Sequence, residues 1–271
     1  MHVIWNKHIQ SNNLWEPEFF GVFYELDGNV MYCFKDRSNL MTLSENSHEP
    51  KLVESFCIEE KLTMPRKWMV IDDKDDLFLL FSKERGINLT NGMLSNKIPD
   101  HIQHSYINQI HQEEYYVEAS FSFGEYTIMH KGKCGYVCKK DGYPIWGFIG
   151  QGYLYTDITH WDGHIAFGTA GSGGFFYVID IANGEVLNAI QTGGTRNFVR
   201  IAHYCYLLDN STPSQLLCID LTDGTIISQC QLVGKNTLNS RISLIKNRIH
   251  TITFDHSKNK QGSVIWNCVE I

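Results

Sequence analysis

Two histidines at a predicted tight turn are of a type and spacing that could bind a metal ion. His160 and His164 flank the dipeptide Asp162-Gly163, which joins two short apolar runs. On neighbouring strands the two imidazoles could share a zinc ion. However, two ligands are too few without a carboxylate aimed at the same point. We therefore predict no metal ion at this turn.

A second group of histidines lies in the longest connection of the chain, between Pro99 and Gln112. His101 and His104 stand there beside Tyr106. Long connections in compact domains often carry function, because their backbone is exposed and tolerates change. A metal site, a partner-binding loop and an insertion without function all fit the pattern. The sequence leaves these three interpretations open.

Other segments have the composition of ligand-binding loops but lack the rest of the motif. Gly171-Ser-Gly-Gly174 is followed by no lysine and no helix, both of which a phosphate-binding P-loop requires. The acidic run Asp72–Asp76 lacks the ligand spacing and closing glutamate of a calcium loop. The patterns Gly-x-Ser-x-Gly and His-Glu-x-x-His do not occur. We therefore predict no catalytic residue, no metal ion and no cofactor.

The cysteines have surroundings that indicate free thiols. A chain of 271 residues can bury a core of its own and needs no disulfide for stability. Most cysteines lie in apolar runs such as Leu216–Ile219, where cysteine behaves as a small hydrophobic residue. We expect free thiols in a reducing compartment and a cytoplasmic protein. The eight cysteines are Cys33, Cys57, Cys134, Cys138, Cys205, Cys218, Cys230 and Cys268.

The formal net charge of −7 bears on the class of partner. Nucleic-acid binding without sequence preference needs clustered cations, and the 23 basic residues form no block, so we predict no nucleic-acid partner. No apolar run approaches the ~20 residues that span a bilayer, and the first residues lack the pattern of a signal peptide. We therefore predict no membrane contact. An acidic surface would steer the protein toward a basic partner.

The elements that must position these residues are marked by a series of turn dipeptides. Each dipeptide joins an Asp or Asn to a Gly, and such pairs supply the positive φ angles of two-residue hairpin turns. Short runs rich in Val, Ile, Tyr, Phe and Leu flank them, which indicates an all-β fold. The dipeptides are Asp27-Gly28, Asn91-Gly92, Asp141-Gly142, Asp162-Gly163, Asn183-Gly184 and Asp223-Gly224.

The turns recur with a period. Val178–Leu187 matches Cys218–Ile227 at a spacing of 40 residues, and Tyr136–Trp146 is an earlier copy. A repeat of this length, with four strands each, is typical of β-propellers. We predict one propeller domain over residues 1–271, with six blades averaging about 45 residues. Seven blades remain the alternative.

The two ends of the chain predict how the last blade is completed. Val264–Ile271 aligns with the third strand of the earlier blades, and the chain stops one strand short. Residues 1–9 resemble the missing outer strand. We therefore expect residues 1–9 to pair with the strand that ends at Ile271, so that no sheet edge stays open.

Val178–Leu187, Cys218–Ile227 and the ending Gly142–Trp146 share one pattern. Two apolar residues, an Asp, an apolar residue, two variable residues and a Gly precede a short apolar strand that can carry Trp. This pattern resembles the repeat of quinoprotein-like (PQQ-like) propellers, clearly over about residues 130–230. The resemblance implies the fold but no quinone cofactor, because quinoprotein dehydrogenases have eight larger blades. Tryptophan occupies the docking position of that repeat only at Trp146 and Trp5.

These features favour a propeller that binds a protein and has no catalytic activity. The connections on one face contain residue types that are enriched at interface hot spots. A dedicated inhibitor of one basic protein, such as an immunity protein that covers the active site of a nuclease toxin, fits the acidic charge. The predicted partner-contacting residues are Trp15, His101, His104, Tyr106 and Arg196.

A metal-dependent hydrolase of the six-bladed, lactonase-like class is the alternative. Such enzymes hold a metal ion at the axis with carboxylates and amides. The spacing of the candidates does not separate them from ordinary surface residues. They are Glu16, Glu18, Glu113, Glu114, Asn197 and Asn210.

Overall fold

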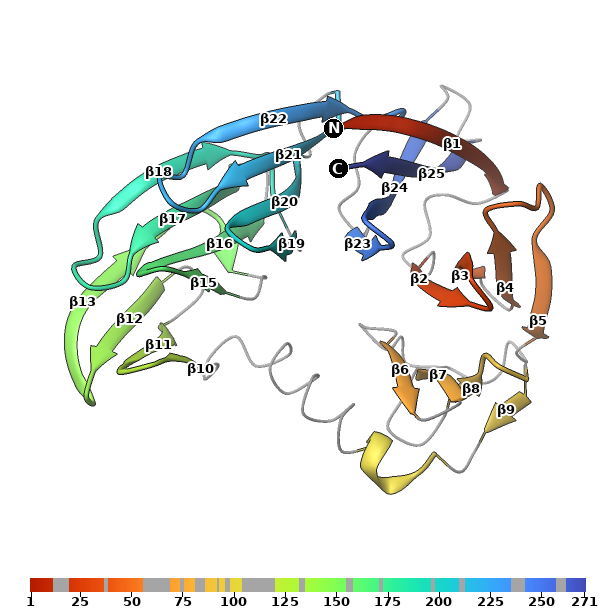
Figure 1. Cartoon of the computed structure of the whole chain (residues 1–271), viewed down its shortest axis with the longest axis horizontal. Helices are drawn as coiled ribbons and strands as arrows, with labels where there is room; N and C mark the ends of the chain where they lie inside the picture. The colour runs from red at the N-terminus through yellow and green to blue at the C-terminus, as the bar shows by residue number, and fades with distance from the viewer. Residues whose placement is uncertain are drawn as a thin grey trace. The chain divides into compact units, whose positions relative to one another are not determined.

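The computed structural model describes most of the chain. Apart from a helical turn over residues 100–103, the regular structure of the described residues is β-strand (Figure 1). The all-β class predicted from the sequence is confirmed. The described residues are 1–11, 20–36, 39–55, 69–73, 76–80, 86–91, 93–95, 98–103, 120–131, 135–154, 158–170, 173–195, 198–209, 213–234, 242–256 and 262–271.

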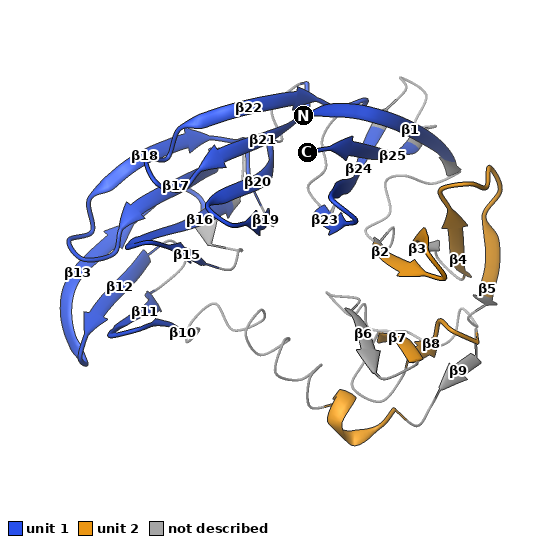
Figure 2. Ribbon diagram, in the orientation of Figure 1, with its two compact units in different colours: residues 1–10, 113–256, 263–271 blue, residues 11–112, 257–262 orange. Residues whose placement is uncertain are grey.

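Contacts between residues divide the chain into two compact units (Figure 2). Unit 1 comprises residues 1–10, 113–256 and 263–271, and unit 2 comprises residues 11–112 and 257–262. The single domain expected from the sequence stays a prediction.

Unit 2 contains two four-stranded antiparallel sheets whose strands follow chain order. We call them blades 1 and 2. Blade 1 consists of β2 (Phe20–Leu26), β3 (Asn29–Asp36), β4 (Asn39–Ser44) and β5 (Lys51–Ser55). Blade 2 consists of β6 (Met69–Asp73), β7 (Asp76–Leu80), β8 (Gly86–Asn88) and β9 (Met93–Ser95).

Unit 1 contains four further sheets, blades 3 to 6. Blade 3 consists of β10 (Ser120–Phe123), β11 (Tyr126–Lys131), β12 (Gly135–Lys140) and β13 (Tyr143–Ile149). Blade 4 consists of β14 (Tyr153–Leu154), β15 (Thr159–Trp161), β16 (His164–Ala170), β17 (Phe175–Asp180) and β18 (Val186–Gln191), with both β14 and β15 paired to β16. Blade 5 consists of β19 (Phe198–Ile201), β20 (Tyr204–Asp209), β21 (Gln215–Asp220) and β22 (Ile226–Gln231). Blade 6 consists of β23 (Ile242–Ile245), β24 (Arg248–His256), β25 (Gly262–Glu270) and β1 (His2–Ser11).

The six sheets formed by the described residues are the blades expected from the 40–50 residue repeat. The fold is that of a six-bladed β-propeller, so six blades, not the alternative of seven, are confirmed. Middle strands such as β17 and β21 are buried along most of their length and read as continuous apolar runs. Outer strands such as β13 and β18 alternate between exposed and half-buried side chains over much of their length.

The predicted pairing of the two chain ends is also confirmed. The strand order in blade 6 is β1-β25-β24-β23, so residues 1–9 supply the outermost strand, and both ends lie close together (Figure 1). Side chains of β1 alternate: Val3, Trp5 and Ile9 are half-buried or buried, whereas Ile4 is exposed. The Trp5 ring packs edge-on against Trp266 of β25, with 5.1 Å between centroids.

The chemistry of the repeated Asp-x-x-x-Gly pattern is visible at the turn between β17 and β18. The Asp180 carboxylate accepts backbone hydrogen bonds from Ala182 at 2.8 Å and Asn183 at 3.1 Å. The Asp180 carbonyl accepts a bond from the Gly184 amide at 2.9 Å. Asp220 binds Thr222 and Gly224 in the same way. The Asp in each copy therefore satisfies the backbone amides of the turn that follows it.

The turn-type prediction is right for three dipeptides and wrong for two. Asp27-Gly28, Asp141-Gly142 and Asp162-Gly163 have positive φ at both residues, as a two-residue hairpin turn requires. Asn183-Gly184 and Asp223-Gly224 instead lie within five-residue turns, residues 181–185 and 221–225, in which only the glycine has positive φ. The reason is the preceding Asp, whose carboxylate stabilises the longer turn by accepting a hydrogen bond from the amide of Ala182 or Thr222. Gly92 of the sixth dipeptide lies outside the described residues.

The docking tryptophan of the repeat is present between blades 3 and 4. Trp146 on β13 donates from its indole Nε1 to the Ile181 carbonyl of the next blade at 2.8 Å. A Cβ atom on Gly184, where φ is +77°, would lie 2.7 Å from the Trp146 ring, so the close approach requires glycine. At the next interface Asn188 replaces the tryptophan and donates to the Gly224 carbonyl at 2.7 Å.

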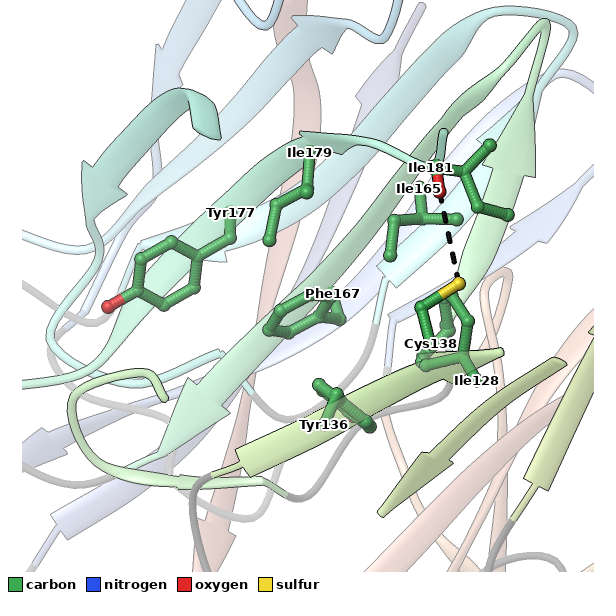
Figure 3. Packing of buried hydrophobic residues seen from close by; sticks show 9 residues of the cluster. Ile128, Tyr136, Cys138, Ile165, Phe167, Tyr177, Ile179 and Ile181 are labelled. Atoms are coloured by element: carbon green, nitrogen blue, oxygen red, sulfur yellow. Dashed lines mark hydrogen bonds between the residues drawn. The ribbon is translucent and has the colours of Figure 1, made fainter. Parts of the chain in front are cut away.

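Blades 3 and 4 also share an aromatic core. The rings of Tyr136 and Phe167 pack edge to face with 4.7 Å between centroids, and Tyr177 lies 5.6 Å from Phe167 (Figure 3). The thiol of Cys138 points to the Ile181 carbonyl at 3.8 Å (Figure 3). Each aromatic pair adds about 1 kcal/mol beyond its burial. Because both blades contribute, each stabilises the other.

The six cysteines among the described residues are free and buried. Burial raises the pKa of Cys33 and Cys205, and it raises the pKa of Cys138 to about 11. A thiol with a raised pKa is not a nucleophile at neutral pH, because the thiolate is the reactive form. These residues therefore pack as small hydrophobic side chains, as predicted. Cys57 and Cys134 lie outside the described residues.

Deleting residues 1–9 tests the role of β1. The deletion leaves one edge of β25 unpaired and uncovers Trp266, so we expect the thermal midpoint to fall by more than about 10 °C. Ile4→Ser is the control, since this side chain of β1 points to solvent, and it should shift the midpoint by less than about 2 °C. Equal midpoints for the truncated and intact chains would contradict the closure.

Alanine substitutions at two glycines of nearly equal φ separate the effect of the docking contact on stability from the effect of backbone strain. A Cβ at Gly142 meets no atom within 4 Å, so Gly142→Ala lowers the free energy of unfolding only through its left-handed backbone, by about 1 kcal/mol. Gly184→Ala has the same backbone effect, and its collision with Trp146 adds about 1–3 kcal/mol. We therefore expect urea unfolding to show the larger loss for Gly184→Ala. Equal losses would show that the tryptophan contact is not tight.

Candidate functional site

Of the five residues predicted to contact a partner, the structure describes His101. It is exposed on the helical turn of unit 2, where the Pro99 carbonyl accepts bonds from Ile102 and Gln103 at 3.0 Å. Ile102 is buried in a cluster with Ile98, which anchors this end of the long connection. The other four residues, Trp15, His104, Tyr106 and Arg196, lie outside the described residues.

The carboxylates and amides considered for a hydrolase are likewise not described. Glu16, Glu18, Glu113, Glu114, Asn197 and Asn210 all fall outside the described residues. Within the described part of the chain, no group of three or more His, Cys, Asp or Glu side chains could hold a metal ion.

The described residues instead bring together a set of hairpin turns in unit 1. In each blade the turn of the first hairpin lies beside the turn of the second. The Ile181 amide donates to the Gly163 carbonyl at 2.8 Å, and the Leu221 amide donates to the His203 carbonyl at 2.8 Å. We call this end of blades 3 to 5 the turn edge. It consists of residues 123–126, 140–143, 161–164, 180–186, 201–204 and 220–226.

Two ring contacts join three blades at the turn edge, and they involve the consecutive residues His160 and Trp161 of β15; we call Phe123, His160, Trp161 and His203 the ring chain. Phe123 of blade 3 stacks on His160 of blade 4, with 5.0 Å between ring centroids and planes 21° apart. Trp161, the next residue, lies 5.8 Å from His203 of blade 5, and the Arg200 guanidinium sits 5.7 Å above the Trp161 ring. Each of these side chains except Arg200 is half-buried, and Arg200 is exposed. The rings therefore link the blades and still face solvent.

His160 and His164 do not form a ligand pair. The His160 ring stacks on Phe123, whereas His164 Nδ1 donates to the Leu221 carbonyl at 3.0 Å. Burial lowers the pKa of His160, and the positive charge of Arg200 lowers it further. A neutral imidazole stacks on an aromatic ring without the cost of burying a charge. The two imidazoles therefore have different partners and do not converge on one point.

The ring chain was not predicted from the sequence. The segment from His160 to His164 was weighed only as a metal site, and the predicted partner contacts lie on the connecting loops. One pattern in the sequence could have indicated this surface. The turns between the first two strands of adjacent repeats are flanked by Trp161, Arg200 and Tyr204. Trp, Tyr and Arg are the residue types enriched at hot spots.

A buried histidine in blade 6 is a separate feature. His250 Nδ1 accepts a hydrogen bond from the Trp266 indole Nε1 at 3.1 Å, and its Nε2 lies 3.9 Å from the Cys268 thiol. Burial lowers the pKa of His250 to about 4, and Arg248 contributes to the shift. One histidine and one cysteine are too few ligands for a metal ion. The residue is therefore a neutral part of the core.

Comparisons with known proteins support the fold. No protein-family model and no curated protein matches the chain. The chain is similar to the crystal structure of BamB from Moraxella catarrhalis at 13% identity, over 90% of this chain and 68% of that chain, with a TM-score of 0.37. It is also similar to a chain in the crystal structure of a mitotic checkpoint complex at 7% identity, over 100% of this chain and 92% of that chain, with a TM-score of 0.55.

The second of these structures supports the propeller fold. The resemblance to a repeat β-propeller predicted from the sequence is confirmed at the level of the fold. At these identities the similarity concerns the fold alone. Within the described part of the chain, no helical segment has the length and apolar character needed to cross a bilayer.

His250 predicts how stability depends on pH. The unfolded chain takes up a proton at His250 near pH 6.5, whereas the folded chain does so only near pH 4. Stability should therefore fall as the pH is lowered through this window, by on the order of 3 kcal/mol. Above about pH 6.5 both states are neutral and this dependence disappears.

Urea unfolding of His250→Gln between pH 7 and pH 4.5 measures this contribution. Glutamine can still accept the Trp266 hydrogen bond but has no proton to gain in this range. We expect the variant to lose less stability than the parent as the pH falls. His48→Gln serves as control because His48 is exposed. If His250→Gln follows the pH profile of the parent, His250 is not the group responsible.

Proposed function

We propose that this chain is a protein-binding propeller without catalytic activity. The observation that carries the proposal is the ring chain of the turn edge, from Phe123 through Trp161 to His203. Half-buried aromatic rings with an exposed Arg200 supply large, rigid contact area at little cost in side-chain entropy. A similar propeller occurs in a mitotic checkpoint complex, and participation in an assembly suits the present chain as well.

The partner that suits the chain best is a basic protein. The formal net charge of −7 would speed the association of oppositely charged surfaces. We propose a dedicated cytoplasmic inhibitor of one basic protein, such as an immunity protein that silences a nuclease toxin. The free, buried cysteines with raised pKa are in keeping with a reducing compartment. Trp15, His101, His104, Tyr106 and Arg196 remain proposed contacts on the connecting loops.

Purification of the tagged chain from its native host, with identification of the co-eluting protein, tests the proposal. We expect a basic protein whose activity falls on titration with the purified chain to one equivalent. The association rate should drop about tenfold or more between 50 and 500 mM salt, because screening weakens steering. A rate independent of salt would contradict the basic partner.

Metal analysis of the same preparation separates the binding module from the hydrolase. One stoichiometric calcium or zinc ion per chain, together with lactonase or esterase turnover that a chelator abolishes, would contradict the proposed function. A preparation that binds its partner equally well after dialysis against a chelator would support it.

A further inference from the structure

The turn edge is strongly acidic. Its six segments carry seven carboxylates, and the basic side chain within them is that of Lys140, with Arg200 as the next residue along β19. Exposed acids occur in all three blades, so the charge extends over the whole edge. The seven carboxylates are Glu125, Asp141, Asp162, Asp180, Glu185, Asp220 and Asp223.

Most of these carboxylates have no cationic partner within the described residues. Glu125 pairs with Lys140 at 2.8 Å, and Asp220 lies 3.8 Å from His203. No salt bridge to a described side chain occurs at Asp141, Asp162 or Glu185. The edge therefore has a surplus of negative charge that its own side chains do not neutralise.

Hydrogen bonds within the turns hold some of the acids in place. Oδ1 of Asp223 accepts from the Thr225 amide at 2.9 Å and from the Thr225 hydroxyl at 2.8 Å, and these bonds lower the pKa of Asp223. Asp180 and Asp220 are bound by the amides of their own turns. Carboxylates fixed in this way lose little entropy when a cation binds, which favours affinity.

Apolar side chains adjoin the acids at the start of each outer strand. Tyr143 is 77% exposed, Val186 42% and Ile226 44%. The ring chain at the first-hairpin turns adds aromatic surface. Apolar and aromatic residues among charged ones are the composition of a protein interface with a polar rim.

The outer strands are poorly suited to pairing with a strand of a partner. Near its start, each pairs with the neighbouring strand of its blade through a register shift. The shifts lie opposite Cys138 and Lys139 of β12, Val178 and Ile179 of β17, and Cys218 and Ile219 of β21. β13 also carries Pro144, which has no amide hydrogen to donate. Bulges and proline are devices that protect a sheet edge. A partner would therefore dock through side chains on the turns and not by extending a sheet.

We propose that the turn edge of blades 3 to 5 is the docking surface for a basic protein segment in which lysine or arginine alternates with apolar residues. The cations meet the unpaired carboxylates, and the apolar residues contact Tyr143, Val186 and Ile226. This inference rests on the proposed function and gives it a location. It places the main contact on the hairpin turns and not on the connections that hold Trp15 and Arg196, which lie outside the described residues.

The first experiment uses an amidated peptide alternating lysine with leucine as the probe, and its glutamate counterpart as the control peptide. Zero-length carbodiimide coupling joins lysine amines to nearby carboxylates, and mass spectrometry identifies the coupled residues. We expect coupling of the lysine peptide at Asp162, Glu185 and Asp223. Coupling spread evenly over these residues and over Glu49 and Asp100 of unit 2 would overturn the proposal, as would no coupling at all.

A pair of charge-matched variants tests the energetic contribution. Glu185→Lys with Asp162→Asn changes the turn edge, and Asn retains the tolerance of Asp for the positive φ at this position. Glu49→Lys with Asp100→Asn makes the same change in net charge in unit 2, where both side chains are exposed. We expect the edge variant to bind the lysine peptide about fivefold more weakly at low salt and the control variant to bind it unchanged. Equal weakening would mean that only bulk charge matters, which would overturn the proposal.

The protein that co-elutes from the native host separates this inference from the proposed function. If that protein binds the edge variant as tightly as the parent chain but is lost on Trp15→Ala or Arg196→Ala, the docking surface is wrong and the proposed function stands. If the chain binds the peptide at the turn edge but has no protein partner in its host, the proposed function fails instead. Thermal midpoints of all variants confirm that they fold.

Discussion

A side chain of one blade seated against a glycine turn of the next is the contact on which the rest of unit 1 depends. Trp146 lies against Gly184, and Asn188 lies against Gly224. The approach is possible only because these turns have no Cβ in the way and because an Asp holds the turn open with its carboxylate. These contacts therefore determine both the spacing of neighbouring blades and the position of their turns.

The same contact determines the surface of the turn edge. Once successive blades are held in register, their first-hairpin turns lie close enough for Phe123 to stack on His160 and for Trp161 to contact His203. No single blade contains this surface, since each contact joins residues from two blades. The acids of the second-hairpin turns lie beside it because paired turns bond to each other through their backbones.

Much of the fold could be predicted from local patterns. Asp-Gly pairs, the 40-residue repeat and the incomplete last copy depend on near neighbours in sequence, and they led to six blades and to the pairing of residues 1–9. The turns at Asn183-Gly184 and Asp223-Gly224 were assigned the wrong length because an Asp three residues earlier binds their amides. The ring chain was missed because its contacts join residues about 40 positions apart, and periodicity does not reveal which side chains meet. The residues proposed on the loops lie largely outside the described segments.

Hydrogen exchange, measured on the chain with and without the protein that co-elutes from its host, tests the central claim most directly. The amides of residues 161–164, 180–186 and 220–226 should exchange more slowly in the complex, because a docked partner excludes water from the turn edge. Protection confined to the ends of the strands away from these turns, with unchanged exchange at the three segments, would contradict the account.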